Sequence, residues 1–155
     1  MNIITPFLWF ENNALEAANF YVSIFPNSKI LSISKMDNTP SGTVEIVSIS
    51  LNGMNFTLMS AGPFDRFNQA ISFVISCDDQ KEVDYYWSNL SAVSESEQCG
   101  WLKDKYGITW QVVPKQLGQL MSDPDPIKAS RVQKAMLKMK KIIISDLQNA
   151  YDDNN

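Results

Sequence analysis

Histidine is absent from this chain of 155 residues, and its absence removes several kinds of functional site. No Ser-His-Asp or Cys-His nucleophilic arrangement can form, and no imidazole can bind a metal. A general base would have to be a carboxylate, a thiolate, a lysine, a tyrosine or water. Cysteine is also scarce, because Cys77 and Cys99 are the only two. In a chain of this length, two cysteines indicate free thiols rather than a disulfide framework.

Positive charge and long apolar runs are lacking as well. The chain has 13 Lys and Arg against 17 Asp and Glu, and the net charge of −4 gives no overall attraction to nucleic acid or to an anionic membrane. No apolar stretch approaches the ~20 residues that span a bilayer. The first residues lack the basic region of a secretory signal. We therefore expect a cytoplasmic protein that binds neither nucleic acid nor membrane.

The N-terminal part reads as a strand followed by a helix. Residues Ile3 to Phe10 are mostly apolar and aromatic, as in a buried strand. Asn13 and Glu16 have the spacing of a capping box, and apolar residues then recur at helical spacing from Ala14 to Ile24. Proline 26 predicts the end of this helix.

The same design returns 66 residues later, from position 13 to position 79. Residues Ala70 to Ser76 form an apolar strand pattern, Asp79 and Glu82 repeat the capping pair, and Val83 to Leu90 carry the helical stripe. Because caps and stripes coincide at a single interval, we interpret the pattern as an internal duplication.

Further strand patterns follow each helix. In the first copy they are Ser28 to Met36, Thr43 to Leu51 and Met54 to Ser60, with a hairpin turn at Asn52-Gly53. In the second copy they are Ser94 to Gln98, Cys99 to Lys105 and Ile108 to Val113, with a turn at Tyr106-Gly107. The prediction is an α+β fold of paired βαβββ modules, about 1–63 and 69–114, which form a curved mixed sheet around a cavity in one domain, 1–121.

Residues 122–151 are predicted to form a C-terminal helical extension. Asp125 suits the cap of a helix that starts with Pro126, and Ser145 suits the cap of a last helix through Tyr151. One face of the first of these helices is apolar, through Ala129, Val132, Ala135, Met136 and Met139. The opposite face is basic, through Lys128, Arg131, Lys134 and Lys138. This face could bind an acidic partner, but a solvated face on a packed helix is the favoured interpretation.

Three segments carry a family resemblance, and they read ITPFLWFENNALEAANFYVSIFPNSKI, CGWLKDKYGITWQVVP and SDPDPIKASRVQKAMLKMKKIIISDLQNAY. They resemble the PhnB-like branch of the vicinal-oxygen-chelate superfamily, whose members often carry the name 3-demethylubiquinone-9 3-methyltransferase. The resemblance implies a cavity that accepts a small molecule, and a homodimer.

The resemblance also implies where metal-using members place their ligands. Those positions are held here by Pro6, Thr57, Ser72 and Gln111. Proline offers no side-chain donor, and the other three are neutral, weak oxygen ligands, whereas a divalent ion needs anionic oxygens, thiolates or imidazoles. We therefore predict no catalytic metal and no cofactor.

If these four positions face the cavity, strand alternation places every second residue beside them. The residues then predicted to line the cavity are Leu8, Phe10, Thr57, Met59, Ser72, Val74, Ser76, Thr109, Gln111 and Val113. The residues predicted to face the helices are Phe7, Trp9, Phe73, Ile75, Trp110 and Val112.

Two other residues, Trp101 and Cys99, are candidates for the site. Trp101 occupies the place of a cavity tyrosine in the fosfomycin-resistance enzymes that the chain resembles, where it could stack on a ligand or fill the cavity or a dimer seam. Cys99 could be a nucleophile or an inert thiol, and inert is favoured for it as for Cys77. Glu95 and Glu97 are predicted to lie on a solvated edge.

Asp104 starts the turn that contains Gly107, and an aspartate at the start of a turn usually bonds nearby backbone N–H groups. We therefore predict a structural role for Asp104.

Three functions remain open. The first is the binding of a small, planar or apolar molecule in the cavity. The second is an enzyme that acts on a small aromatic or quinone-like substrate, as the methyltransferase name implies, although Phe10 to Asn13 lack the glycines of a methyl-donor loop. The third is an interaction protein. The first is the prediction, and the exact role stays open.

Overall fold

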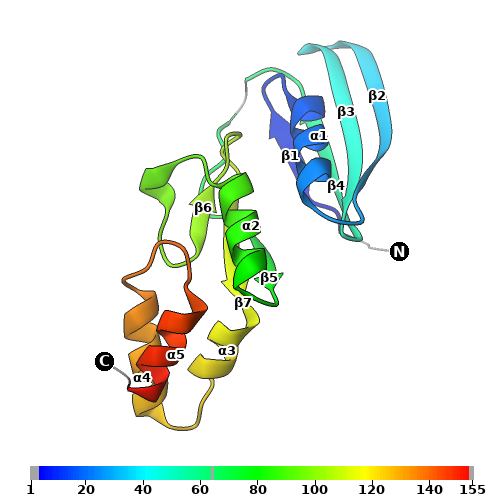
Figure 1. Cartoon of the computed structure of the whole chain (residues 1–155). Helices are drawn as coiled ribbons and strands as arrows, with labels where there is room; N and C mark the ends of the chain where they lie inside the picture. Colours follow the sequence, from blue (N-terminus) through cyan, green and yellow to red (C-terminus); the bar gives the residue numbers. More distant parts are fainter. Residues whose placement is uncertain (1–3, 64, 154–155) are drawn as a thin grey trace. The chain divides into compact units, whose positions relative to one another are not determined.

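The computed structural model describes residues 4–63 and 65–153. The chain divides into two compact units, Met1–Arg66 and Phe67–Asn155. The boundary between the units falls between the two predicted modules, and the second unit also holds the C-terminal helices (Figure 1).

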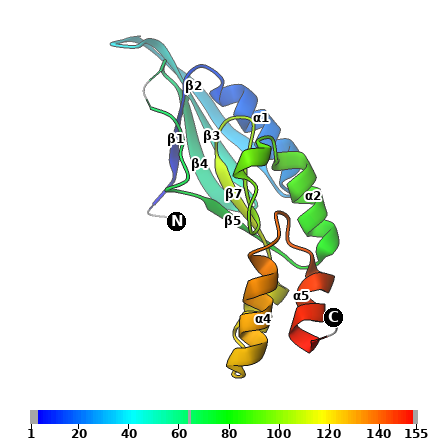
Figure 2. The same cartoon turned by 90° about the vertical axis from the view of Figure 1, so that its left-hand side faces the viewer.

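The described residues of the first unit form one sheet and one helix. Its elements in chain order are β1 (Phe7–Phe10), α1 (Ala14–Ile24), β2 (Lys29–Thr39), β3 (Gly42–Leu51) and β4 (Met54–Ser60). The strand order is β1-β4-β3-β2, in which β1 runs parallel to β4 and the other pairs are antiparallel (Figure 2). The predicted βαβββ order is confirmed here, and β2 extends three residues beyond its predicted end.

The core of this unit lies between α1 and the sheet. Ala17, Ala18 and Tyr21 of α1 are buried, as are Val47 of β3 and Leu58 of β4. Small alanines let the helix approach the sheet closely, which favours dense packing.

A tight hairpin joins β3 to β4 as predicted. Asn52 and Gly53 have φ values of 46° and 86°. Two consecutive positive φ values are those of a type I′ turn, and Asn-Gly is the pair that adopts it most readily.

The two predicted capping pairs behave differently. Asp79 caps α2 because its Oδ1 accepts a hydrogen bond from the Glu82 N–H at 2.9 Å. Asn13 makes no side-chain cap bond, which corrects the prediction for α1. Instead the Ala14 N–H donates to Ser60 Oγ at 2.9 Å, so a side chain from β4 replaces the expected cap.

The second unit contains a smaller sheet and most of the helices. Its elements are β5 (Phe73–Cys77), α2 (Gln80–Leu90), the 3₁₀ turn η1 (Ser94–Ser96), β6 (Trp101–Lys103), β7 (Thr109–Pro114), α3 (Lys115–Met121), α4 (Pro126–Met136) and α5 (Ile144–Asp152). The strand order is β5-β7-β6, with β5 parallel to β7 and β6 antiparallel to it.

The predicted strand from Ser94 to Gln98 is wrong. Ser96 N donates to Val93 O, which closes a 3₁₀ turn, and Gln98 alone retains an isolated bridge to Trp101. The Glu97 carboxylate accepts from Ser91 Oγ at 2.6 Å and so holds this segment against the end of α2. This side-chain contact takes the place of the backbone hydrogen bonds that a strand would have made.

The helices after β7 pack around an apolar cluster of Leu117, Val132, Ile142 and Leu147. Val132, which belongs to the predicted apolar face of α4, is therefore buried. Asp125 caps α4 as predicted, because its Oδ1 accepts from the Ile127 N–H at 2.9 Å. In the part of the chain that the structure describes, no helix is both long and apolar enough to cross a membrane.

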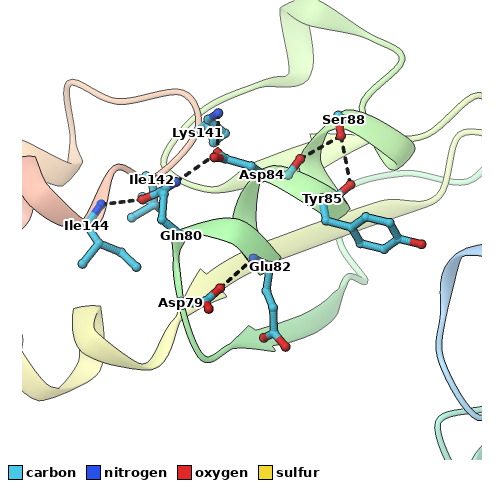
Figure 3. Close-up of polar contacts among 9 residues, drawn as sticks. All are labelled: Asp79, Gln80, Glu82, Asp84, Tyr85, Ser88, Lys141, Ile142 and Ile144. Carbon is cyan, nitrogen blue, oxygen red and sulfur yellow. Dashed lines mark hydrogen bonds and ion pairs between the residues drawn. The ribbon is translucent and has the colours of Figure 1, made fainter.

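The start of α5 corrects a second capping prediction. The helix begins at Ile144, and Ser145 lies inside it instead of capping it. Gln80 of α2 supplies the missing acceptor, because its Oε1 accepts from the Ile144 N–H at 2.8 Å (Figure 3). The cap comes from a residue 64 positions away, which no local pattern reveals.

The basic face of α4 is partly used inside the chain. Arg131 donates from Nε to Ala150 O at 2.9 Å and from Nη2 to Tyr151 O at 2.7 Å, at the C-terminal end of α5. The Lys128 ammonium lies 4.7 Å from the centroid of the Tyr151 ring. These contacts support a packed helix with a solvated face, since cations are favoured near carbonyls at a helix end.

Candidate functional site

The register of the first sheet divides the predicted site residues between its two faces. Thr57 pairs with Phe7 and Met59 pairs with Trp9, whereas Phe10 pairs with Ser60. Phe10 is 3% exposed, on the side covered by α1. Thr57 and Met59 therefore lie on the open face, and the prediction that Phe10 shares that face is wrong.

The physical reason is a one-residue difference in register. Thr57 and Gln111 are equivalent by hairpin position, but Thr57 pairs with Phe7 while Gln111 pairs with Val74, the equivalent of Leu8. A shift of one residue moves every side chain of a strand to the other face. Phe7, which was predicted to face a helix, is consequently 56% exposed.

The second sheet has a consistent open face. Gln111 pairs with Val74 on one side and with Trp101 on the other, so the three side chains lie on the same face. The Gln111 amide also donates to Ser72 Oγ at 2.8 Å. The alternate residues Ile75, Trp110 and Val112 are buried on the side of α2.

Thr109 also belongs to this open face, because it pairs with Lys103 of β6. Thr109 is 2% exposed, and its Oγ1 has no hydrogen-bond partner within the described ranges. A buried hydroxyl without a partner costs roughly 1–3 kcal/mol. Thr109, one of the residues predicted for the site, is thus buried and does not line the cavity found in the structure.

A cavity of about 420 Å³ lies beside Trp101, within the second unit. Its lining side chains are Gln69, Glu95, Ser96, Gln98, Cys99 and Trp101. Cavities of roughly 300–1,000 Å³ are the usual size for small-molecule sites. Of the residues predicted for the site, the structure brings Trp101 and Cys99 together here.

Four lining residues, Gln69, Glu95, Ser96 and Gln98, were absent from the predicted site. Sequence reasoning missed them because it assigned Ser94 to Gln98 to a strand and left Gln69 in a linker. The polar run Ser94-Glu95-Ser96-Glu97-Gln98 was the available signal, since it contains no residue that favours a buried strand.

A strained turn shapes one wall of the cavity. Gln98 and Trp101 exchange backbone hydrogen bonds of 3.1 and 2.8 Å, and the residues between them, Cys99 and Gly100, have φ values of 52° and 86°. This is again type I′ geometry, in which a cysteine at positive φ is uncommon. A Cβ on Gly100 would lie 2.9 Å from Val112 O, so position 100 requires glycine.

The chain after α4 holds this turn in place. The Cys99 N–H donates to Met139 O and the Gly100 N–H donates to Lys140 O, each at 2.8 Å. Lys140 Nζ also lies 3.2 Å from Glu97 Oε2 and 3.3 Å from Ser94 O. The C-terminal extension therefore supports the cavity wall directly.

The comparisons with known proteins give the family. The model of the 3-demethylubiquinone-9 3-methyltransferase family matches residues 2–113. The chain belongs to this family. Its family and fold are of the vicinal-oxygen-chelate type.

Solved structures agree with that assignment. A PhnB protein from Bacillus cereus, named as a 3-demethylubiquinone-9 3-methyltransferase, is 33% identical with a TM-score of 0.63, covering 73% of this chain and 99% of its own. A fosfomycin resistance protein, FosX, from Listeria monocytogenes is 14% identical with a TM-score of 0.53, covering 76% of this chain and 94% of its own. The latter shows the fold alone. A search of curated proteins found no match.

The side chains at the family's metal positions do not fit a divalent ion. Pro6 has no donor atom, and the Ser72 hydroxyl is already paired with the Gln111 amide. Among residues 4–63 and 65–153, no group of three or more Cys, Asp or Glu side chains is arranged to hold a metal ion. The predicted lack of a catalytic metal stays a prediction that elemental analysis can test.

The two acidic residues beside the cavity differ in their electrostatic surroundings. The hydrogen bond from Ser91 and the contact with Lys140 lower the pKa of Glu97. Glu95 is exposed and makes no hydrogen bond or ion pair in the described part of the chain. The predicted solvated edge thus applies to Glu95, whereas Glu97 is a paired structural group.

The two cysteines also differ. Burial, followed by repulsion from Glu82, Asp78 and Asp79, raises the pKa of the Cys77 thiol to about 12. Cys99 is partly exposed and lines the cavity. Burial and the raised pKa agree with the predicted inert role of Cys77, and the role of Cys99 stays open.

Proposed function

We propose that this family member binds a small, planar or apolar molecule in the cavity beside Trp101. The observation that carries the proposal is the cavity itself, which places an indole ring among amide, hydroxyl, thiol and carboxylate groups. None of its six lining side chains has a side-chain hydrogen bond or ion pair within the described residues. Such convergent, unused polar groups around an aromatic surface are typical of small-molecule sites.

Trp101 supplies the main apolar contact. Its ring has no aromatic or cationic neighbour in the part of the chain described, in contrast to Trp110, which packs against Phe73 with ring centroids 5.4 Å apart. Stacking of a flat ligand contributes about 0.5–1.5 kcal/mol beyond the burial of apolar area. An available indole face therefore favours planar ligands.

The neighbouring strand can orient such a ligand. Gln111 lies directly across from Trp101 in the register, and adjacent strands are about 4.8 Å apart. The hydrogen bond to Ser72 fixes the Gln111 amide. A ligand that extends from Trp101 along this face would meet a positioned amide.

The proposal can be tested with a thermal-shift screen of aromatic metabolites and quinones. Bound compounds should raise the melting temperature, and the rise should grow with the logarithm of the ligand concentration once this exceeds Kd. Trp101→Ala should abolish the shift and Trp101→Phe should retain part of it. Trp87→Ala on α2 is the matched control and should leave the shift intact. Equal shifts in Trp101→Ala and the parent protein would reject this site.

The alternative, an enzyme, follows from the family name, which describes methyl transfer. The fold consists of two mixed sheets instead of a doubly wound parallel sheet, and Glu11 to Asn13 connect β1 to α1 without a glycine. A methyl-donor nucleotide commonly sits on such a glycine-rich turn. We therefore expect calorimetry with S-adenosylmethionine to show no binding, and a micromolar Kd would support the enzyme.

A further inference from the structure

We infer that the molecule bound beside Trp101 is an organic cation with a flat ring. This inference rests on the proposed function and names the class of ligand for the same cavity. It follows from the negative charge that lines the cavity and from the absence of a positive charge among the described lining residues.

The lining contains one formally charged side chain. Gln69, Gln98, Ser96 and Cys99 offer neutral polar groups, and Glu95 offers a carboxylate. Glu95 has no ion pair or hydrogen bond within the described ranges, so its negative charge is not neutralised by the chain. A cation is the ligand charge that complements this lining.

The neighbouring positive groups do not reverse this preference. Lys140 is engaged with Glu97 Oε2 and Ser94 O, at 3.2 and 3.3 Å. Lys103 shares the open sheet face with Trp101, but it pairs with Thr109 at the far end of β6 and does not line the cavity. The Glu97 carboxylate therefore neutralises the charge of the Lys140 ammonium. Glu95 remains the charged group in the cavity lining that a ligand would contact.

The Trp101 ring also favours a cationic ligand. The face of an indole ring is electron-rich and attracts a cation within about 6 Å, more strongly for Trp than for Tyr or Phe. Because Trp101 and Glu95 line one cavity, a single ligand can contact both. The same contacts would disfavour an anion, since the carboxylate repels it and the ring gives no compensating attraction.

The experiment compares three flat probes of similar size and different charge. They are 1-methylquinolinium, which is cationic, 1-methylnaphthalene, which is neutral, and 1-naphthoate, which is anionic. Binding is followed by NMR on the Trp101 indole N–H, assigned from its loss in Trp101→Phe. We expect the cation to bind about five- to tenfold tighter than the neutral probe, given the modest strength of exposed charge contacts.

Two variants separate the local charge from the net charge. Glu95→Gln should reduce the affinity for the cation by roughly fivefold and leave the neutral probe unchanged. Asp146→Asn, on α5, removes the same charge outside the cavity and should change neither. Loss of cation preference in both variants alike would show that net charge alone is responsible, which overturns the inference.

The outcomes distinguish this inference from the proposed function. If the neutral probe shifts the Trp101 signal as strongly as the cation does, the cavity binds flat molecules and the cationic class is wrong. If 1-naphthoate binds best, the class is also wrong. If no probe perturbs the Trp101 signal at millimolar concentration, both the inference and the proposed site fail.

Discussion

Asp104 is a buried charged residue of the second unit, 1% exposed. Its Oδ1 accepts from the backbone N–H groups of Tyr106 and Ile108 at 2.9 and 3.0 Å, and its Oδ2 accepts from Trp110 Nε1 at 2.8 Å. Three donors satisfy the carboxylate, which is the condition for a buried charge to be tolerated. The predicted structural role is therefore confirmed.

Asp104→Ala should destabilise the protein strongly, because it leaves two backbone N–H groups and the Trp110 indole without their acceptor. We expect the free energy of unfolding to fall by about 2–4 kcal/mol. Urea denaturation followed by tryptophan fluorescence measures this change. Asp146→Ala is the exposed control, expected within about 0.5 kcal/mol of the parent. A loss below about 1 kcal/mol for Asp104→Ala would contradict the structural role.

The two thiols should react differently with iodoacetamide, since the thiolate is the reactive form. The raised pKa of about 12 keeps Cys77 protonated at pH 8, and its side chain is buried. Cys99 is partly exposed in the cavity wall. Mass spectrometry of the native protein at pH 8 should therefore find alkylation at Cys99 alone, and at both residues after unfolding. Rapid modification of native Cys77 would refute this.

At the scale of elements, the segment between α4 and α5 contacts two other parts of the second unit, α2 and the cavity wall. Gln80 of α2 donates from Nε2 to Ile142 O at 3.2 Å and accepts from the Ile144 N–H (Figure 3). Lys141 pairs with Asp84 at 2.6 Å on the same helix. Its neighbour Lys140 reaches Glu97 instead. Adjacent lysines thus fasten one segment to α2 and to the cavity wall.

Lys140→Ala should loosen the turn at Cys99 and Gly100 more than Lys141→Ala does. Both changes remove one lysine, but Lys140 alone contacts the chain that carries this turn. Native-state hydrogen exchange of the two turn amides, which donate to Met139 O and Lys140 O, reports local opening. We expect roughly two- to fivefold faster exchange in Lys140→Ala, in keeping with an exposed ion pair. Equal exchange in the two variants would argue against this support.

At the scale of the whole molecule, the family fold is retained while the family's metal positions hold proline, threonine, serine and glutamine. Fold and chemistry are separable, because a sheet requires its apolar face whereas a metal requires specific donors. Neutral side chains at Thr57, Ser72 and Gln111 repay little of the cost of dehydrating a divalent ion.

Protein purified without added metal or an affinity tag should accordingly contain less than stoichiometric Zn, Ni, Mn or Fe. Inductively coupled plasma mass spectrometry measures the content directly. Gln111→Glu introduces an anionic oxygen at one family ligand position. Comparing its metal content with that of the parent protein tests whether the neutral side chain accounts for the low content. An equimolar metal in the parent protein, lost in Gln111→Ala, would refute the prediction.

Much of the fold could be predicted because its determinants are local. The helical stripe Ala14 to Ile24 has the bounds of α1, and the Asn52-Gly53 turn and the Asp125 cap depend on a few neighbouring residues. The site was predicted only in part. Trp101 and Cys99 line the cavity, but its remaining residues come from segments whose structure depends on distant partners.

The sequence by itself determined the repeated strand-helix pattern, the buried faces of both helices and the neutral residues at the metal positions, because spacing and side-chain chemistry act over a few residues. Tertiary structure decided the register that buries Phe10, the acceptor from Gln80 that caps α5, and the contacts that fold Ser94–Ser96 into a turn. Each of these depends on a partner tens of residues away or on a one-residue alignment between strands. Packing in the folded chain selects these arrangements, because the local conformational preferences of the residues do not distinguish them from the alternatives.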